Sequence, residues 1–129
     1  IRPGQPVAFG KIQGKLAFGL PGNPVSSMVT FDQLVRPAMM KLGGHAVWER
    51  PTVKATFKEK FSKQTDRRHL LRGVLAYEGS DLVVRTTGKQ GSGILTSMVK
   101  ANGFIDVPEE VETLQPGDVV NVQLLSRNF

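Results

Sequence analysis

A tight turn runs directly into the only long helical pattern of the sequence, in residues 19–44 (GLPGNPVSSMVTFDQLVRPAMMKLGG). Pro21 and Gly22 favour a turn, because proline presets φ and glycine supplies conformational freedom. Asn23 is a good N-cap, and Pro24 suits the first helical position, where its missing N–H costs nothing. We therefore expect a strand, a tight turn and a helix that begins at Pro24.

The start of this helix is also a candidate anion site. The first N–H groups of a helix have no partner within it and lie at the positive end of the helix dipole. Ser26 and Ser27 add two hydroxyl groups to the first turn. A capped strand-to-helix connection that binds no ligand explains the same residues and is the commoner case. The turn by itself therefore leaves both interpretations open.

Apolar residues recur along the helix at spacings of three and four, which predicts one buried face. The residues of this face are Met28, Phe31, Val35, Ala38, Met39 and Leu42. Pro37 has no N–H to donate to Gln33, so we expect the helix to be kinked or divided there. Asp32 and Arg36 are four residues apart and are expected to pair on the outer surface.

The composition is that of a soluble globular protein, with 40% apolar and 22% charged residues among 129. No apolar run approaches the roughly 18 residues that a membrane-spanning helix needs. The absence of cysteine excludes disulfides and thiolate metal sites and favours a cytoplasmic protein. His45 and His69 are too few and too far apart in sequence to indicate a zinc site. The opening residues, IRPG, are typical of the middle of a loop and predict a piece of a longer protein.

The net charge of +6 is unevenly distributed. The basic residues of one stretch are Arg50, Lys54, Lys58, Lys60, Lys63, Arg67, Arg68 and Arg72. Such a basic stripe is compatible with binding an anion or nucleic acid, and equally with the solvated face of a strand pair. Nucleic acid is the weaker alternative, because no aromatic residues interleave with the basic ones to stack bases. The acidic residues Asp106, Glu109, Glu110 and Glu112 are expected to form a solvated face.

Short strands flanked by turn residues account for most of the remaining sequence. Residues 6–10 and 15–20 predict a hairpin around Ile12, Gln13 and Gly14. Residues 45–51 are expected to form a linker. The further predicted strands are residues 52–57, 69–77, 82–87, 103–107 and 119–125, and the first of them places Val53, Ala55 and Phe57 on one face. This regular series favours a compact, bent β-barrel, and residues 61–67 are expected to form a polar loop.

Residues 87–97 (TGKQGSGILTS) combine three glycines with serine and lysine side chains. Consecutive N–H groups in such a segment can form a nest for an anion. The spacing is not that of a P-loop, and a plain flexible loop is the commoner explanation.

Four stretches, residues 19–27, 72–75, 87–92 and 114–120, occur in an order that resembles the MoeA family of bacterial molybdopterin molybdenumtransferases, which includes the E domain of gephyrin. The resemblance extends over essentially the whole chain. It implies an α+β fold, in which residues 1–44 end an α/β molybdopterin-binding domain and residues 45–129 form a small bent β-barrel of the β-clip type.

The resemblance also implies an activity for the longer protein. Members of the family insert molybdate into adenylylated molybdopterin with the help of Mg²⁺ and release AMP. The implied protein is a cytoplasmic homodimer that works with other molybdenum-cofactor synthesis proteins. Its Mg²⁺ ligands are expected upstream of Ile1, and none is expected in this sequence.

The resemblance assigns site residues by position. The implied substrate- and cofactor-binding residues are Pro21, Gly22, Asn23, Pro24, Ser26 and Lys89, and the implied catalytic residues are Arg72 and Ser92. Arg72 carries a permanent charge on a planar fork of donors, which suits phosphate or molybdate oxygens. Ser92, with glycine N–H groups beside it, is expected to position the anion by hydrogen bonds and not to act as a nucleophile.

Two alternatives from other functional classes stay open. The barrel is also compatible with a non-catalytic protein-docking or scaffold module, and the basic stripe with a nucleic-acid-binding β-barrel.

Overall fold

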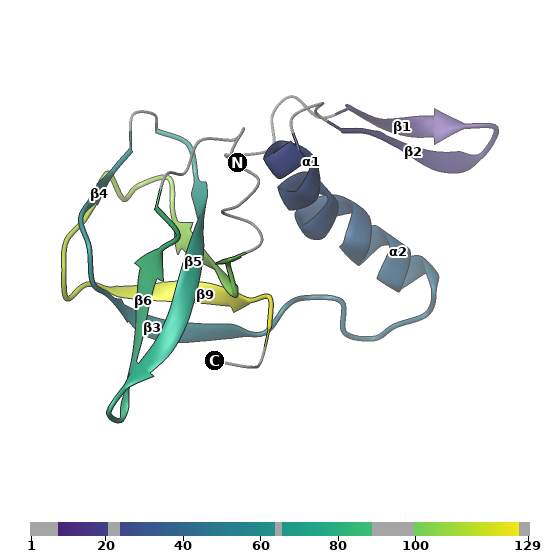
Figure 1. Cartoon of the computed structure of the whole chain (residues 1–129). Helices are drawn as coiled ribbons and strands as arrows, with labels where there is room; N and C mark the ends of the chain where they lie inside the picture. The colour runs from purple at the N-terminus through teal and green to yellow at the C-terminus, as the bar shows by residue number, and fades with distance from the viewer. Residues whose placement is uncertain (1–7, 21–23, 64–65, 89–99, 127–129) are drawn as a thin grey trace.

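A computed structural model describes residues 8–20, 24–63, 66–88 and 100–126 of the chain. In chain order it consists of a β-hairpin, an interrupted helix and a closed β-barrel (Figure 1). The helix lies between the hairpin and the barrel. The predicted α+β fold with a C-terminal barrel is confirmed. Among the helices of the described ranges, none has both the length and the apolar character needed to cross a membrane.

The hairpin consists of β1 (Ala8–Ile12) and β2 (Lys15–Gly19), which pair in antiparallel fashion. Gln13 and Gly14 form its turn with positive φ values of 52° and 78°, a backbone twist that matches the twist of the two strands. Phe9 and Phe18 lie opposite each other with ring centroids 5.2 Å apart. The predicted hairpin is confirmed, although β1 extends to Ile12, where the turn was expected.

The helical region is divided, as predicted from Pro37. Its three parts are α1 (Pro24–Thr30), the π-helical turn η1 (Phe31–Val35) and α2 (Arg36–Leu42). The backbone N–H of Arg36 bonds to the carbonyl oxygen of Phe31, five residues earlier. Because Pro37 cannot donate the next helical hydrogen bond, the wider turn just before it accommodates the missing donor.

The predicted buried face of the helix is wrong. Met28, Phe31, Met39 and Leu42 are 44–74% exposed. The buried residues are instead Ser26, Val29, Thr30 and Asp32. Periodicity identifies an apolar stripe but not the side on which a neighbouring element packs. The π turn also rotates the residues after it about the helix axis relative to those before it. An apolar stripe with one regular spacing is therefore not continuous along the helix.

The predicted pair between Asp32 and Arg36 is also wrong. Asp32 pairs with Arg50, and Arg36 donates to the carbonyl oxygen of Trp48. A local pair four residues apart stabilises a helix by only about 0.2–0.5 kcal/mol, so the tertiary partners prevail.

Five strands close the barrel in the order β3-β6-β5-β7-β9. Their bounds are Thr52–Phe57 for β3, His69–Glu78 for β5, Asp81–Thr86 for β6, Gly103–Val107 for β7 and Val119–Leu124 for β9. The β3–β6 pair is parallel, and the other pairs are antiparallel. Each bound lies within one residue of its prediction.

A further short pair was not predicted. It joins β4 (Phe61–Ser62) to β8 (Thr113–Leu114) in antiparallel fashion, where a polar loop was expected. Two residues are too few for a period-two pattern to be seen in a sequence. The segment between α2 and β3 has no regular secondary structure, and the division into domains at residue 44 stays a prediction.

The barrel interior is apolar and tightly packed. Its buried residues are Ala55, Phe57, Leu71, Leu75, Val84, Ile105, Val107, Leu114, Val120, Val122 and Leu124. Gly73 of β5 and Gly103 of β7 lie opposite each other. A Cβ atom on Gly103 would lie 2.5 Å from Cγ1 of Val122 and 3.2 Å from the carbonyl oxygen of Gln123. The close approach of strands at this point therefore requires glycine.

We expect Gly103→Ala to lower the free energy of unfolding by about 1–3 kcal/mol, because the added methyl group overpacks the interior. Urea denaturation measures the effect. Gly10→Ala is the control, since a Cβ atom there meets nothing within 4 Å. A Gly103→Ala variant as stable as the unmodified protein would contradict this account of the barrel.

Candidate functional site

The structure describes three of the eight residues that the sequence assigned to the site. Arg72 and Ser26 have described side chains, and Pro24 is described as the first residue of α1. The other five lie outside the described residues: Pro21, Gly22, Asn23, Lys89 and Ser92.

Arg72 lies on the outer face of β5 and is nevertheless buried. Side chains alternate along a strand. Leu71 belongs to the barrel core, so Leu70 and Arg72 point outward. Leu70 packs against Val29 of α1 and Phe104 of β7, and Arg72 pairs in register with Phe104. Arg72 is only 1% exposed. A cation is therefore buried on the face of the barrel that meets the helix.

Ser26 lies on the matching side of the helix. It precedes Val29 by three residues, a spacing that places both on one face, and both are buried. Because Val29 contacts Leu70, the structure brings Ser26 and Arg72 to the same interface between helix and barrel.

Burial lowers the pKa of Arg72 from its ordinary value to about 10, because removal from water disfavours the charged form. Arg72 still carries its charge at neutral pH. A guanidinium group in such surroundings interacts more strongly with an oxyanion than one in water does, because the local dielectric constant is lower.

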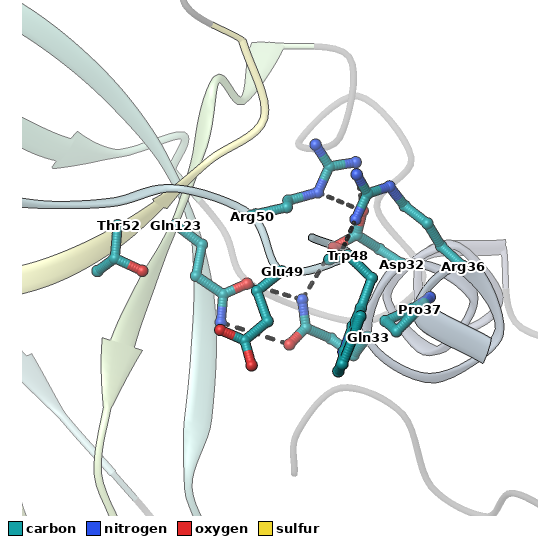
Figure 2. A pocket seen from close by; sticks show the side chains of 9 residues that line it. All are labelled: Asp32, Gln33, Arg36, Pro37, Trp48, Glu49, Arg50, Thr52 and Gln123. Atoms are coloured by element: carbon teal, nitrogen blue, oxygen red, sulfur yellow. Dashed lines mark hydrogen bonds and ion pairs between the residues drawn. The ribbon is translucent and has the colours of Figure 1, made fainter. Parts of the chain in front are cut away.

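A polar cavity of about 340 Å³ opens between the helix and the barrel (Figure 2). Its lining residues are Asp32, Gln33, Arg36, Pro37, Trp48, Glu49, Arg50, Thr52 and Gln123. Nε of Arg50 donates to Oδ1 of Asp32 at 2.6 Å, and Nε2 of Gln33 donates to Oδ2 of Asp32 at 2.8 Å. Nε2 of Gln33 also lies 2.8 Å from Oε1 of Gln123. Sequence reasoning missed this cluster.

A second cavity, of about 440 Å³, has mainly apolar walls. Asp32, Arg36 and Arg50 line both cavities. The ion pair between Asp32 and Arg50 therefore lies at the boundary between the polar cavity and the apolar one. Leu20 and Phe31 are among the apolar residues of the second cavity.

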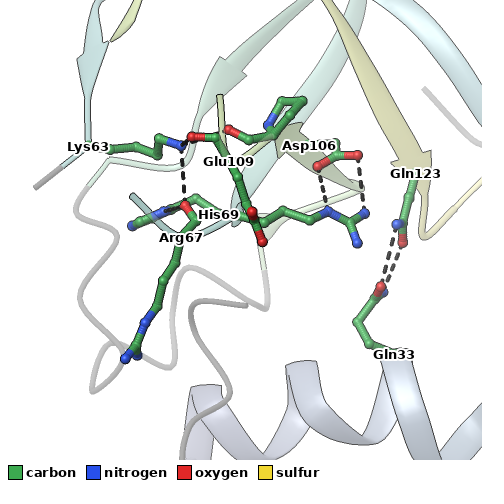
Figure 3. Close-up of polar contacts among 9 residues, drawn as sticks. Gln33, Lys63, Arg67, His69, Asp106, Glu109 and Gln123 are labelled. Atoms are coloured by element: carbon green, nitrogen blue, oxygen red, sulfur yellow. Dashed lines mark hydrogen bonds and ion pairs between the residues drawn. The ribbon is translucent and has the colours of Figure 1, made fainter. Parts of the chain in front are cut away.

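Much of the basic stripe is engaged within the protein. Nζ of Lys63 donates to the carbonyl oxygens of Arg67, Pro108 and Glu109 at 3.2, 2.6 and 2.9 Å (Figure 3). Arg68 makes two bonds to the Asp106 carboxylate, at 2.8 and 3.1 Å. These contacts weaken the case for a nucleic-acid surface.

The acidic segment is only partly the solvated face that was expected. Glu109, Glu110 and Glu112 are exposed, as predicted. Asp106 is half-buried and pairs with Arg68 instead. Within the described ranges, no three histidine, aspartate or glutamate side chains gather as metal ligands would.

Comparison with known proteins identifies relatives of the chain. Residues 54–125 match the family model described as "MoeA C-terminal region (domain IV)". A molybdopterin molybdenumtransferase of Haemophilus influenzae is 38% identical over 95% of this chain and 31% of its own length. That of Staphylococcus epidermidis is 31% identical over 98% of this chain and 30% of its own length.

A solved structure shares the fold. The molybdopterin biosynthesis MoeA protein from Pyrococcus horikoshii OT3 superposes with a TM-score of 0.74 and 32% identity, over 95% of this chain and 30% of that one. The chain thus spans somewhat less than a third of the length of these relatives.

We expect Arg72→Met to lower the free energy of unfolding less than Leu70→Ala does, because methionine keeps the apolar stem of the side chain and avoids the desolvation of a buried charge, which offsets the polar contacts that are lost. The lowered pKa of Arg72 reflects this desolvation. Urea denaturation measures the change.

The matched control is Leu70→Ala on the same face of β5. Leu70 is fully buried, and its truncation is expected to lower the free energy of unfolding by about 2–5 kcal/mol. If Arg72→Met destabilises the protein as much as Leu70→Ala does, the charge of Arg72 stabilises the fold and our interpretation is wrong.

Proposed function

The chain belongs to the MoeA family, and from this membership we propose that the longer protein carrying it inserts molybdate into adenylylated molybdopterin and releases AMP. In this proposal the 129-residue chain supplies one wall of the active cleft. The complete site includes residues upstream of Ile1, so the chain alone is not expected to catalyse the reaction.

The observation that carries the proposal is the burial of Arg72 on the face of β5 where Leu70 meets the helix. Both substrates bear oxyanions, and a planar guanidinium group binds phosphate or molybdate oxygens through two parallel hydrogen bonds. Because Arg72 is buried on the outer face of β5, the low local dielectric constant strengthens its attraction to an oxyanion compared with an arginine in water. We assign Arg72 to electrostatic binding of the oxyanion.

The roles of the remaining residues are proposed from the family resemblance. Pro21, Gly22, Asn23 and Pro24, where the sequence enters α1, are proposed to shape the cleft together with Ser26. From the segment between β6 and β7, Ser92 positions the oxyanion by a hydrogen bond, and Lys89 assists it. None of these residues is proposed as a nucleophile.

The proposal extends to the setting of the enzyme. We propose a cytoplasmic homodimer that works alongside other proteins of molybdenum-cofactor synthesis. The Mg²⁺ that the family resemblance implies is proposed to be held by residues outside this chain.

The test is molybdate-dependent AMP release by the full-length protein. We expect Arg72→Met and Ser92→Ala to lower turnover by roughly 100-fold or more, the usual effect of removing a donor that stabilises developing charge. Glu78→Gln is the control, because Glu78 is an exposed barrel residue that pairs with Arg85 and Lys58. Full activity of both site variants would show that the barrel does not contribute to the cleft.

A further inference from the structure

We propose that Asp32, Gln33, Arg50 and Gln123 form an interdomain clasp that fixes the barrel at the angle to the helix at which Arg72 meets the oxyanion. The inference rests on the proposed function and adds four positioning residues to it. None of the four is proposed to touch the substrate.

The need for a clasp follows from how little apolar surface joins the two parts. In the described portion of the chain, the apolar cluster between helix and barrel consists of Val29, Leu70 and Phe104, with Leu125 partly buried against it. All of these contacts lie near α1. One small contact allows the barrel to rotate about it, so a second attachment is needed to set the angle.

The ion pair supplies the first half of that attachment. Asp32 belongs to η1, and Arg50 lies just before β3, where the chain enters the barrel. Nε of Arg50 donates to Asp32 at 2.6 Å, and Nη1 of Arg50 lies 3.5 Å from the carbonyl oxygen of Leu124 on β9. The side chains of Asp32 and Arg50 are 9% and 23% exposed. Salt therefore screens this pair less than a surface pair.

The amide pair supplies the second half. Gln33 and Gln123 exchange hydrogen bonds at 2.8 and 3.4 Å, although 90 residues separate them in sequence. Gln33 therefore ties η1 directly to β9. Because Nε2 of Gln33 also donates to Asp32, the ion pair and the amide pair form one connected network.

The π turn gives the clasp its geometry. Asp32 and Gln33 are consecutive, and consecutive side chains of a helix point in different directions. The wider π turn narrows the angle between them, and Figure 2 shows both side chains reaching from the helix toward the linker and β9. A local irregularity of the helix thus serves an attachment to a distant strand.

A clasp of this kind has a kinetic signature. If the clasp is broken, the barrel samples other angles, and substrate binding must first select the competent one. The apparent affinity for substrate then decreases in proportion to the fraction of molecules in the competent conformation. Saturating substrate draws all molecules into that conformation, so kcat is unchanged. A variant with general structural damage behaves differently, because its active fraction and kcat fall while KM stays unchanged.

The experiment measures steady-state AMP release by the full-length protein carrying Asp32→Asn, Arg50→Gln or both. We expect each variant, and the double variant equally, to raise KM for adenylylated molybdopterin by about tenfold, with kcat within about twofold of the unmodified protein. Glu78→Gln, which removes a carboxylate from an exposed ion pair of the barrel, is expected to leave both constants unchanged.

Charged substitutions at Gln33 and Gln123 test the amide pair separately from the ion pair. Gln33→Glu is expected to raise KM, because it places a carboxylate beside Asp32. Gln33→Lys combined with Gln123→Glu is expected to keep KM near that of the unmodified protein. The new ion pair keeps a donor for Asp32 and still joins η1 to β9. A Gln33→Lys/Gln123→Glu variant as impaired as Gln33→Glu would overturn the role of the amide pair.

A readout without catalysis separates the two proposals. Nitroxide labels at exposed positions on α2 and β3, introduced as Met39→Cys and Lys54→Cys in the full-length protein, report the distance between helix and barrel. We expect a narrow distance distribution that Asp32→Asn broadens. An unchanged distribution with unchanged KM overturns the clasp, whereas absent AMP release by the unmodified protein overturns the proposed function alone.

Discussion

The alternation of side chains along β5 is the constraint that both the barrel and the helix obey. Leu71 and Leu75 point inward and belong to the core, and Gly73 between them leaves room for Ile105. Leu70 and Arg72 point outward toward the helix. A shift of one residue in the pairing of β5 would exchange these two sets, placing a cation inside the barrel. The register of β5 therefore determines the core, the docking of α1 and the position of the cation together.

The buried arginine and the polar clasp are connected by the same interface. Arg72 is buried on the outward face of β5, the face on which Leu70 meets the helix, so its surroundings depend on the angle between helix and barrel. Asp32 and Gln33 hold that angle from η1, and Val29 holds the other end of the contact. The interface combines a small apolar contact with a polar network. Side chains of η1, which lie outside β5, therefore influence the surroundings of Arg72.

The barrel could be predicted from sequence, whereas the way the helix attaches to it could not. Strands such as β3 and β7 carry their own signal, because alternating residues stand between turn residues. The buried side of the helix depends on where the barrel packs, which local periodicity does not contain. The pair of Gln33 and Gln123 has no charge pattern and spans 90 residues. Arg72 was assigned to the site through the family resemblance, and its burial came only from the structure.

The most direct measurement of the central claim is the location of the oxyanion in a crystal of the full-length protein soaked with molybdate. Anomalous scattering at the molybdenum edge identifies the metal without ambiguity. The account predicts molybdate oxygens within hydrogen-bonding distance, about 2.7–3.2 Å, of the Arg72 guanidinium group at the interface of helix and barrel. Molybdate bound elsewhere in the cleft, with Arg72 sealed away from it, would contradict the account.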